Sequence, residues 1–100
     1  MAKKKYVKVV ITPSQRDKKY KAVLTDDKGE TKTLHFGAKG MSDFTIHKDP
    51  NRKERYLARH KKNENWSVPD TPGSLSRWIL WNKTSFKESV KDYKRRFNLK

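Results

Sequence analysis

The chain has 100 residues and a net charge of +15, with 32% hydrophobic and 37% charged residues. This length and hydrophobic content predict one domain with one small core. An aromatic content of 11% distinguishes the chain from a disordered basic tail. The absence of cysteine excludes a disulfide framework, a zinc–thiolate site and a cysteine nucleophile. Such a positive charge favours a polyanionic partner, with nucleic acid first and an acidic protein or anionic membrane second.

A first strand is predicted near the N-terminus, where residues 4–11 read KKYVKVVI. The stretch is rich in β-branched residues, which favour strands. Strict alternation would place Val7, Val9 and Ile11 on one face and Tyr6 on the other.

Two further strands are predicted on either side of a tight turn. Residues 18–25 (KKYKAVLT) alternate in polarity, and residues 30–36 (ETKTLHF) place Phe36 on an apolar face. Between them, DDKG at 26–29 is a strong hairpin turn in which Gly29 can adopt a positive φ. The three strands together predict an antiparallel meander.

The second half of the chain predicts helices. Asp49-Pro50 is an N-cap followed by proline at the first helical position, and this helix is expected to run to about Asn63. Thr71-Pro72 repeats the signal and predicts a second, short helix. Tryptophans near and within that short helix are expected to pack in the core rather than to serve as stacking platforms for bases.

A third helix is expected to begin after Thr84 or Ser85. Its apolar residues form a stripe about 60° wide at 100° per residue. The residues of this stripe are Phe86, Val90, Tyr93 and Phe97. The predicted fold is therefore α+β: a three-stranded antiparallel meander followed by two or three helices packed on one face. Residues 1–100 form one domain, with a mobile basic arm at 1–5, the meander at 6–36 and the helical half at 49–98.

The first predicted helix has a cationic face. Its basic side chains fall within about 80° of arc at 100° per residue. They are Arg52, Arg55, Arg59 and Lys62. Tyr56, Leu57 and His60 occupy a different arc and are expected to face the core. Adjacent cations repel one another, so this face favours an anion, and arginine binds phosphate with paired charge-assisted bonds. The alternative is a solvated charged face with Glu54 and Glu64 nearby.

Other basic residues extend the predicted nucleic-acid footprint. They are Lys39 between two glycines, the last-helix cations Lys87, Lys91, Lys94 and Arg95, and the N-terminal Lys3, Lys4 and Lys5. Lys39 could add charge to backbone amides that cradle a phosphate, although such glycines more often turn the chain. The last-helix lysines have an alternative role in covering the rim of the core with their aliphatic stems.

All three histidines lie between residues 35 and 60. His35, His47 and His60 with Asp43 could hold a divalent ion in a nuclease. Their spacing matches no metal-site signature, and structural roles are simpler: His60 packs at the helix–sheet boundary, and His47 or Asp43 caps a turn. We expect no catalytic residue, no metal and no cofactor.

Several segments together resemble a known family. They are HFGAKGMSDFTIHKD, RKERYLARH, ENW, LSRWILWNK and YKRRFNL. Over about residues 18–99 they are similar to a small uncharacterised family of basic proteins found chiefly in large DNA viruses of algae and protists. The resemblance implies a viral setting, with localisation in the virion, the host nucleus or a viral factory. It implies no catalytic activity.

The leading hypothesis is a non-enzymatic protein that binds viral double-stranded DNA through phosphate contacts, with little regard to sequence. One alternative is a structural virion or minor capsid protein that binds acidic protein partners. The other is a small metal-dependent nuclease. No apolar run approaches the ~20 residues of a membrane span, and the N-terminus lacks the apolar segment of a signal peptide. We therefore expect neither a membrane span nor secretion by that route, and no small-molecule substrate.

Overall fold

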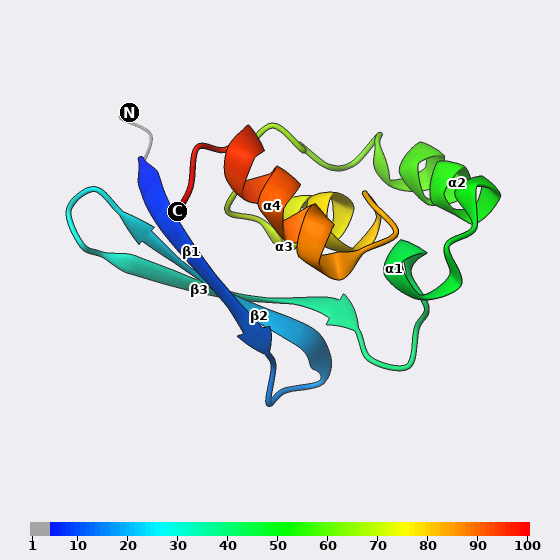
Figure 1. The fold of residues 1–100 in the computed structure, drawn as a ribbon, viewed down its shortest axis with the longest axis horizontal. Coiled ribbons are helices and arrows are strands. Elements are labelled where there is room, and N and C mark those ends of the chain that lie inside the picture. Colours follow the sequence, from blue (N-terminus) through cyan, green and yellow to red (C-terminus); the bar gives the residue numbers. More distant parts are fainter. Residues whose placement is uncertain (1–4) are drawn as a thin grey trace.

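The computed structural model describes residues 5–100 and has an α+β fold, with helices over one face of a three-stranded sheet (Figure 1). The strands are β1 (Tyr6–Pro13), β2 (Lys18–Asp26) and β3 (Thr31–Ala38). They are antiparallel neighbours in the order β1-β2-β3. The predicted meander is confirmed, although β3 continues two residues past the expected end at residue 36.

The turn between β2 and β3 is stabilised by Asp26. Its carboxylate accepts hydrogen bonds from the backbone amides of Lys28 and Glu30, at 2.9 and 2.8 Å. Gly29 has a φ of 85°, which a residue without a Cβ adopts at little cost. The local chemistry of DDKG thus produces the predicted hairpin.

One expected side-chain direction in β1 was wrong. Tyr6 was predicted to face away from Val9, yet Tyr6 is 8% exposed and Val9 is 2% exposed, and both belong to the core. The reason is an irregularity in the pairing with β2, because the register shifts between Tyr6 and Lys8. A bulge adds one residue and reverses the alternation of side chains.

The core lies between the sheet and three C-terminal segments: α3 (Pro72–Leu75), η1 (Ser76–Leu80) and α4 (Phe86–Arg96). Its most buried side chains are Val9, Ala22, Leu24 and Phe36 from the sheet and Leu75, Ile79, Leu80 and Tyr93 from the helices. The stripe of α4 is confirmed, since Tyr93 is fully buried and its three companions pack against the core. Ser85 caps α4 by accepting from the amide of Glu88.

The short helix after Thr71 contains a feature that was not predicted. Thr71 is the N-cap as expected, but α3 continues directly into η1, a π-helical turn. The amide of Trp81 accordingly donates to the carbonyl of Ser76, five residues back. Trp78 and Trp81 are both half-buried and pack at the margin of the core.

The remaining helices, α1 (Phe44–His47) and α2 (Pro50–His60), lie beyond the end of β3, with α2 at one end of the molecule (Figure 1). Asp43 and Asp49 cap them by accepting from the amides of Thr45 and Asn51. The helix predicted from Asp49-Pro50 is thus present, and it ends at His60 rather than near residue 63. Within residues 5–100, no helix combines the length and the apolar character needed to cross a membrane.

Candidate nucleic-acid interface

One side of α2 is fixed to the rest of the molecule by aromatic stacking. Tyr56 is 8% exposed, and its ring lies parallel to that of Trp81, with centroids 4.2 Å apart and planes 3° apart. The ring of His60 stacks on Tyr56 at 4.2 Å. Two of the three residues expected on the inner face are therefore there. Leu57 is half-buried and lines a shallow hollow with the exposed residues Arg55 and Ala58, so its expected direction was wrong.

Lys53 makes a second attachment of α2. Its Nζ donates to the backbone carbonyl of Asn82 at 2.7 Å and lies 4.9 Å from the centre of the Phe44 ring. Burial, with the nearby charges of Arg77 and Lys83, lowers the pKa of Lys53. Because Lys53 and Tyr56 both hold the inner face, the rotation of α2 about its axis is set, and its arginines point away from the core.

The exposed arginines of α2 surround a small hollow. This hollow, here called the arginine pocket, has a volume of about 200 Å³ and is lined by Met41, Ser42, Arg52, Arg55, Arg59 and Trp81. Among residues 5–100, none of the three arginine side chains has a carboxylate within ion-pair distance or makes a hydrogen bond. Lys62, the fourth predicted cation, is exposed beyond the end of α2 and does not line the pocket. The pocket therefore presents three guanidinium groups that an oxyanion could bridge.

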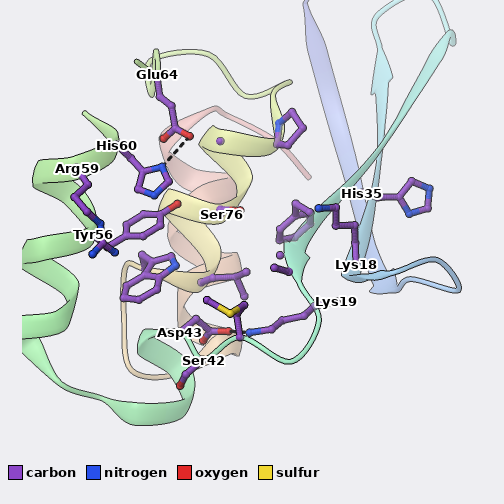
Figure 2. Close-up of a pocket in the computed structure, with 18 residues that line it drawn as sticks. Lys18, Lys19, His35, Ser42, Asp43, Tyr56, Arg59, His60, Glu64 and Ser76 are labelled. Carbon is purple, nitrogen blue, oxygen red and sulfur yellow. Dashed lines mark hydrogen bonds and ion pairs between the residues drawn. The ribbon is translucent and has the colours of Figure 1, made fainter. Parts of the chain in front are cut away.

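A larger hollow adjoins the arginine pocket. It lies between α2, the end of β3, and α3 with η1, has a volume of about 540 Å³, and is here called the central cavity (Figure 2). Its walls include Phe36, Met41, Ser42, Tyr56, Arg59, Ser76, Leu80 and Trp81. Met41, Ser42, Arg59 and Trp81 line both hollows, so the two adjoin at these four residues.

A buried ion pair closes one side of the central cavity. Lys19 Nζ lies 2.6 Å from Asp43 Oδ2, and their side chains are 15% and 3% exposed. The other oxygen of Asp43 accepts from the amide of Thr45 at 2.9 Å, which confirms the turn-capping role expected for Asp43. Since the ammonium of Lys19 balances its charge and it does not line the arginine pocket, this carboxylate does little to repel an anion there.

The three histidines have separate partners. His35 Nδ1 lies 2.8 Å from Ser14 Oγ, His47 Nδ1 accepts from the amide of Asp49 at 2.9 Å, and His60 Nδ1 lies 3.5 Å from Glu64. His47 thus has the predicted capping role. In the described part of the chain, no three side chains of histidine or carboxylate residues are grouped as a metal site would need. The structure does not unite these histidines with Asp43.

The cations of α4 form a separate set. Arg95 Nη2 lies 2.6 Å from one oxygen of Asp92, and Arg96 Nη2 lies 3.4 Å from the other. Burial alone would raise the pKa of Asp92, but hydrogen bonds from Arg95 and Asn82 and the charge of Arg96 lower it overall. Lys91 lies 3.7 Å from Glu88. Lys91, Arg95 and Arg96 therefore each have a carboxylate partner, whereas Lys87 and Lys94 form no ion pair with the described residues.

Lysines of α4 also line a groove beside the sheet. It has a volume of about 470 Å³, and its residues are Val9, Val10 and Ile11 of β1 and Phe86, Lys87, Val90, Lys91 and Lys94 of α4. None of these residues lines the arginine pocket or the central cavity. The α4 lysines expected to extend one footprint thus belong to a different surface feature.

The other predicted contacts are scattered. Lys39 is exposed in a turn between Gly37 and Gly40, whose φ angles are 81° and 82°, and it lines neither hollow. Lys5 is exposed, and its carbonyl accepts from the amide of Asp27. Lys3 and Lys4 lie outside the described residues. Among the described residues, the predicted cations that share a hollow thus form two groups, with Arg52, Arg55 and Arg59 in the arginine pocket and Lys87, Lys91 and Lys94 in the groove beside β1.

Sequence reasoning missed Met41, Ser42 and Trp81 as members of this site. They come from the β3–α1 loop and from the end of η1, and only the folded chain brings them to α2. One local signal was present: Tyr56 and His60 are four residues apart and share a face, which predicts an aromatic partner for α2.

Comparison with known families adds one result. The sequence profile of a family of unknown function, DUF5754, matches residues 3–60. The chain belongs to this family. The part of this DUF5754 protein that matches contains the sheet, α1 and the whole of α2, whereas α3, η1 and α4 follow it in sequence. Neither a curated protein nor a solved structure matches the chain significantly.

Proposed function

We propose that this DUF5754 protein binds nucleic acid without catalysis, and that the arginine face of α2 is its main phosphate-binding surface. The supporting observation is the arginine pocket, where three exposed guanidinium groups share one hollow without a carboxylate partner among residues 5–100. Such groups gain most from an oxyanion that accepts two or more charge-assisted hydrogen bonds. The net charge of +15 favours a polyanion over an isolated anion.

We infer double-stranded DNA as the polymer and expect little sequence preference. Contacts to phosphate position a protein on the duplex but carry no base information. The resemblance to proteins of large DNA viruses favours a viral genome as the target, in the virion, the host nucleus or a viral factory. These statements rest on charge and on the resemblance.

The test is fluorescence anisotropy of labelled duplex DNA, single-stranded DNA and RNA, each titrated with the protein over a range of salt. We expect micromolar or tighter duplex binding and a log–log salt slope of about −0.9 for each phosphate contacted. A magnesium-containing series reports strand cleavage on the same samples. Weak binding to all three polymers at ~0.15 M salt would contradict the proposal.

A second candidate function is binding to an acidic protein partner, as in a virion protein. The groove between β1 and α4 supports it, because Val10 is 45% exposed beside Lys87, Lys91 and Lys94. Apolar surface bordered by lysines suits an acidic peptide with an apolar anchor. Competition between polyglutamate and labelled duplex DNA tests this candidate. If polyglutamate displaces the DNA no better than salt of equal ionic strength, the result argues against an acidic protein partner.

A further inference from the structure

The central cavity and the arginine pocket differ in chemistry although they share four lining residues. The arginine pocket has three cations at its rim, whereas the central cavity has aromatic and aliphatic walls from Phe36, Tyr56, Leu80 and Trp81. Phosphate suits the first hollow, and a flat, uncharged ring suits the second. A ligand that fits both must therefore carry an oxyanion on one end and an aromatic group on the other.

The size of the central cavity fits a small organic group. Its volume of about 540 Å³ falls within the range of roughly 300–1,000 Å³ that is typical of small-molecule sites. Figure 2 shows the rings of Tyr56 and His60 directed from α2 toward the helix that carries Ser76, with the Arg59 side chain lying alongside α2. The cavity therefore has an aromatic wall on the side of Arg59, which also lines the arginine pocket.

Polar groups in the two hollows are available to a ligand. The hydroxyls of Ser42 and Ser76 make no hydrogen bond with residues 5–100, and Ser42 lies at the junction of the hollows. The Glu64 carboxylate lines the central cavity, away from the arginine pocket, and its two oxygens already pair with Trp66 Nε1 at 2.9 Å and His60 Nδ1 at 3.5 Å. Its negative charge would repel a phosphate at that end of the cavity. These positions orient a ligand with its anionic end at the arginines.

We propose that the two adjoining hollows bind one nucleotide unit with an unpaired base, its phosphate in the arginine pocket and its base in the central cavity. The inference rests on the proposed function and adds to it a preference for nucleotides outside a paired stack. The unit can come from a free mononucleotide or from the end of a DNA strand. Both sources present the same phosphate, sugar and base.

The first arm of the test uses free ligands. Calorimetry and tryptophan fluorescence would compare adenosine monophosphate with adenosine and with inorganic phosphate. We expect the monophosphate to bind at least about tenfold more tightly than either part, because each hollow holds one part. Equal binding of monophosphate and inorganic phosphate would mean that the base makes no contact in the cavity, and would overturn the inference for free nucleotides.

Two variants assign the parts of the ligand to the hollows. Ser76→Leu places a larger side chain in the central cavity. It should weaken binding of adenosine monophosphate about tenfold and leave binding of inorganic phosphate unchanged. Arg59→Gln should weaken both ligands. Thr84→Leu, at an exposed position that lines neither hollow, is the matched control and should change neither. Circular dichroism checks that each variant folds, and loss of monophosphate binding in Thr84→Leu alone would contradict the assignment.

The second arm uses DNA that carries 2-aminopurine, either at an unpaired strand end or inside a blunt duplex. Tighter binding of the unpaired end, with a fluorescence change that Ser76→Leu abolishes, supports the strand as the source even if the free monophosphate binds weakly. If the duplex binds normally, but neither the unpaired end nor the monophosphate binds more tightly than its comparison ligand, the inference is overturned and the proposed function stands. Loss of duplex binding as well would overturn both.

Discussion

Helices α2 and α4 are both basic, but their cations have different surroundings. On α4, Arg95 and Arg96 share the carboxylate of Asp92, and the guanidinium of Arg96 also lies 3.7 Å from the Trp78 ring centre. On α2, Arg52 and its two companions have no such partner among residues 5–100. A count of charges does not separate the two helices. Local neutralisation separates their arginines: those of α4 share a carboxylate, and those of α2 are free for an external anion.

The attachment of the two helices differs as well. The buried stripe of α4 packs against the sheet core through Tyr93, whose hydroxyl donates to the carbonyl of Pro69 at 2.7 Å. By contrast, α2 lies away from the sheet and depends on Tyr56, Lys53 and their partners. We infer that α4 serves mainly to close the core, and that α2 is a supported platform whose outer face is free to bind.

Charge reversal on each helix should give the largest difference in DNA affinity between α2 and α4. The double variant Arg55→Glu/Arg59→Glu is expected to lower the affinity for duplex DNA at least about a hundredfold, because charge-assisted phosphate contacts become repulsions. Lys87→Glu/Lys91→Glu changes the net charge by the same amount and should cost about tenfold or less, through the general field alone. Anisotropy at fixed salt measures both. Equal losses would show that only net charge matters.

Loss of the aromatic support should release α2 but leave α4 in place. Tyr56→Ala is expected to lower the free energy of unfolding by about 2–4 kcal/mol, because it empties the stack between Trp81 and His60. Leu57→Ala, on the same helix but outside the core cluster, should cost less than about 1.5 kcal/mol. Urea denaturation provides the comparison. A smaller loss for Tyr56→Ala than for Leu57→Ala would contradict the role given to the stack.

Removal of the Asp92 charge should make α4 behave more like α2. Asp92→Asn frees Arg95 and Arg96 and is expected to strengthen duplex binding by about two- to fivefold, at a cost of about 1–3 kcal/mol in stability. Glu88→Gln, whose partner Lys91 is already 3.7 Å away, should change binding less than about twofold. Unchanged DNA affinity in Asp92→Asn would indicate that α4 does not reach the polymer.

The same variant predicts a pH effect. Because the pKa of Asp92 is lowered in the folded protein, its stabilising contribution is present above the ordinary aspartate pKa and is lost as the pH falls through the folded value. Denaturation of the wild-type protein between about pH 5 and pH 2 should therefore converge on that of Asp92→Asn. A difference in stability that stays constant over this interval would contradict the assignment.

The smallest expected effect concerns the alkaline limit of the α2 stack. Burial, followed by the charge of Glu64, raises the pKa of Tyr56 from 10.0 to about 12. The contribution of the Tyr56 hydroxyl to folding stability is thus complete below pH 10 and is lost as the pH rises toward 12. The reason is that Tyr56 ionises readily in this interval only when the chain is unfolded. Tyr56→Phe should show a shallower loss of stability from pH 10 to 12 than the wild-type protein. Identical slopes would contradict the burial of this hydroxyl.

Local chemistry accounts for the parts of the fold that could be predicted. The DDKG turn, the caps at Asp49 and Thr71, and the stripe of α4 each depend on residues close together in sequence. The bulge near Tyr6 and the π-helical turn before Trp81 could not be predicted in this way. They satisfy packing between distant segments, and each adds one residue to a regular pattern.

The candidate site was predictable only in part for the same reason. The spacing of Arg52, Arg55 and Arg59 on one helical face follows from 100° per residue. Their separation from the α4 cations does not, because it depends on where Asp92 and the edge of β1 lie in space. The cavity walls at Met41 and Trp81 likewise result from the chain's path after β3 and η1.

The most direct test of the α2 platform is the salt dependence of duplex binding for the wild-type protein and for the neutral variant Arg52→Gln/Arg55→Gln/Arg59→Gln. If the three arginines bind phosphates, the log–log slope of the variant should be shallower by about 2–3, as each lost phosphate contact removes about 0.9. A slope unchanged from that of the wild-type protein would contradict the account and place the phosphate contacts elsewhere.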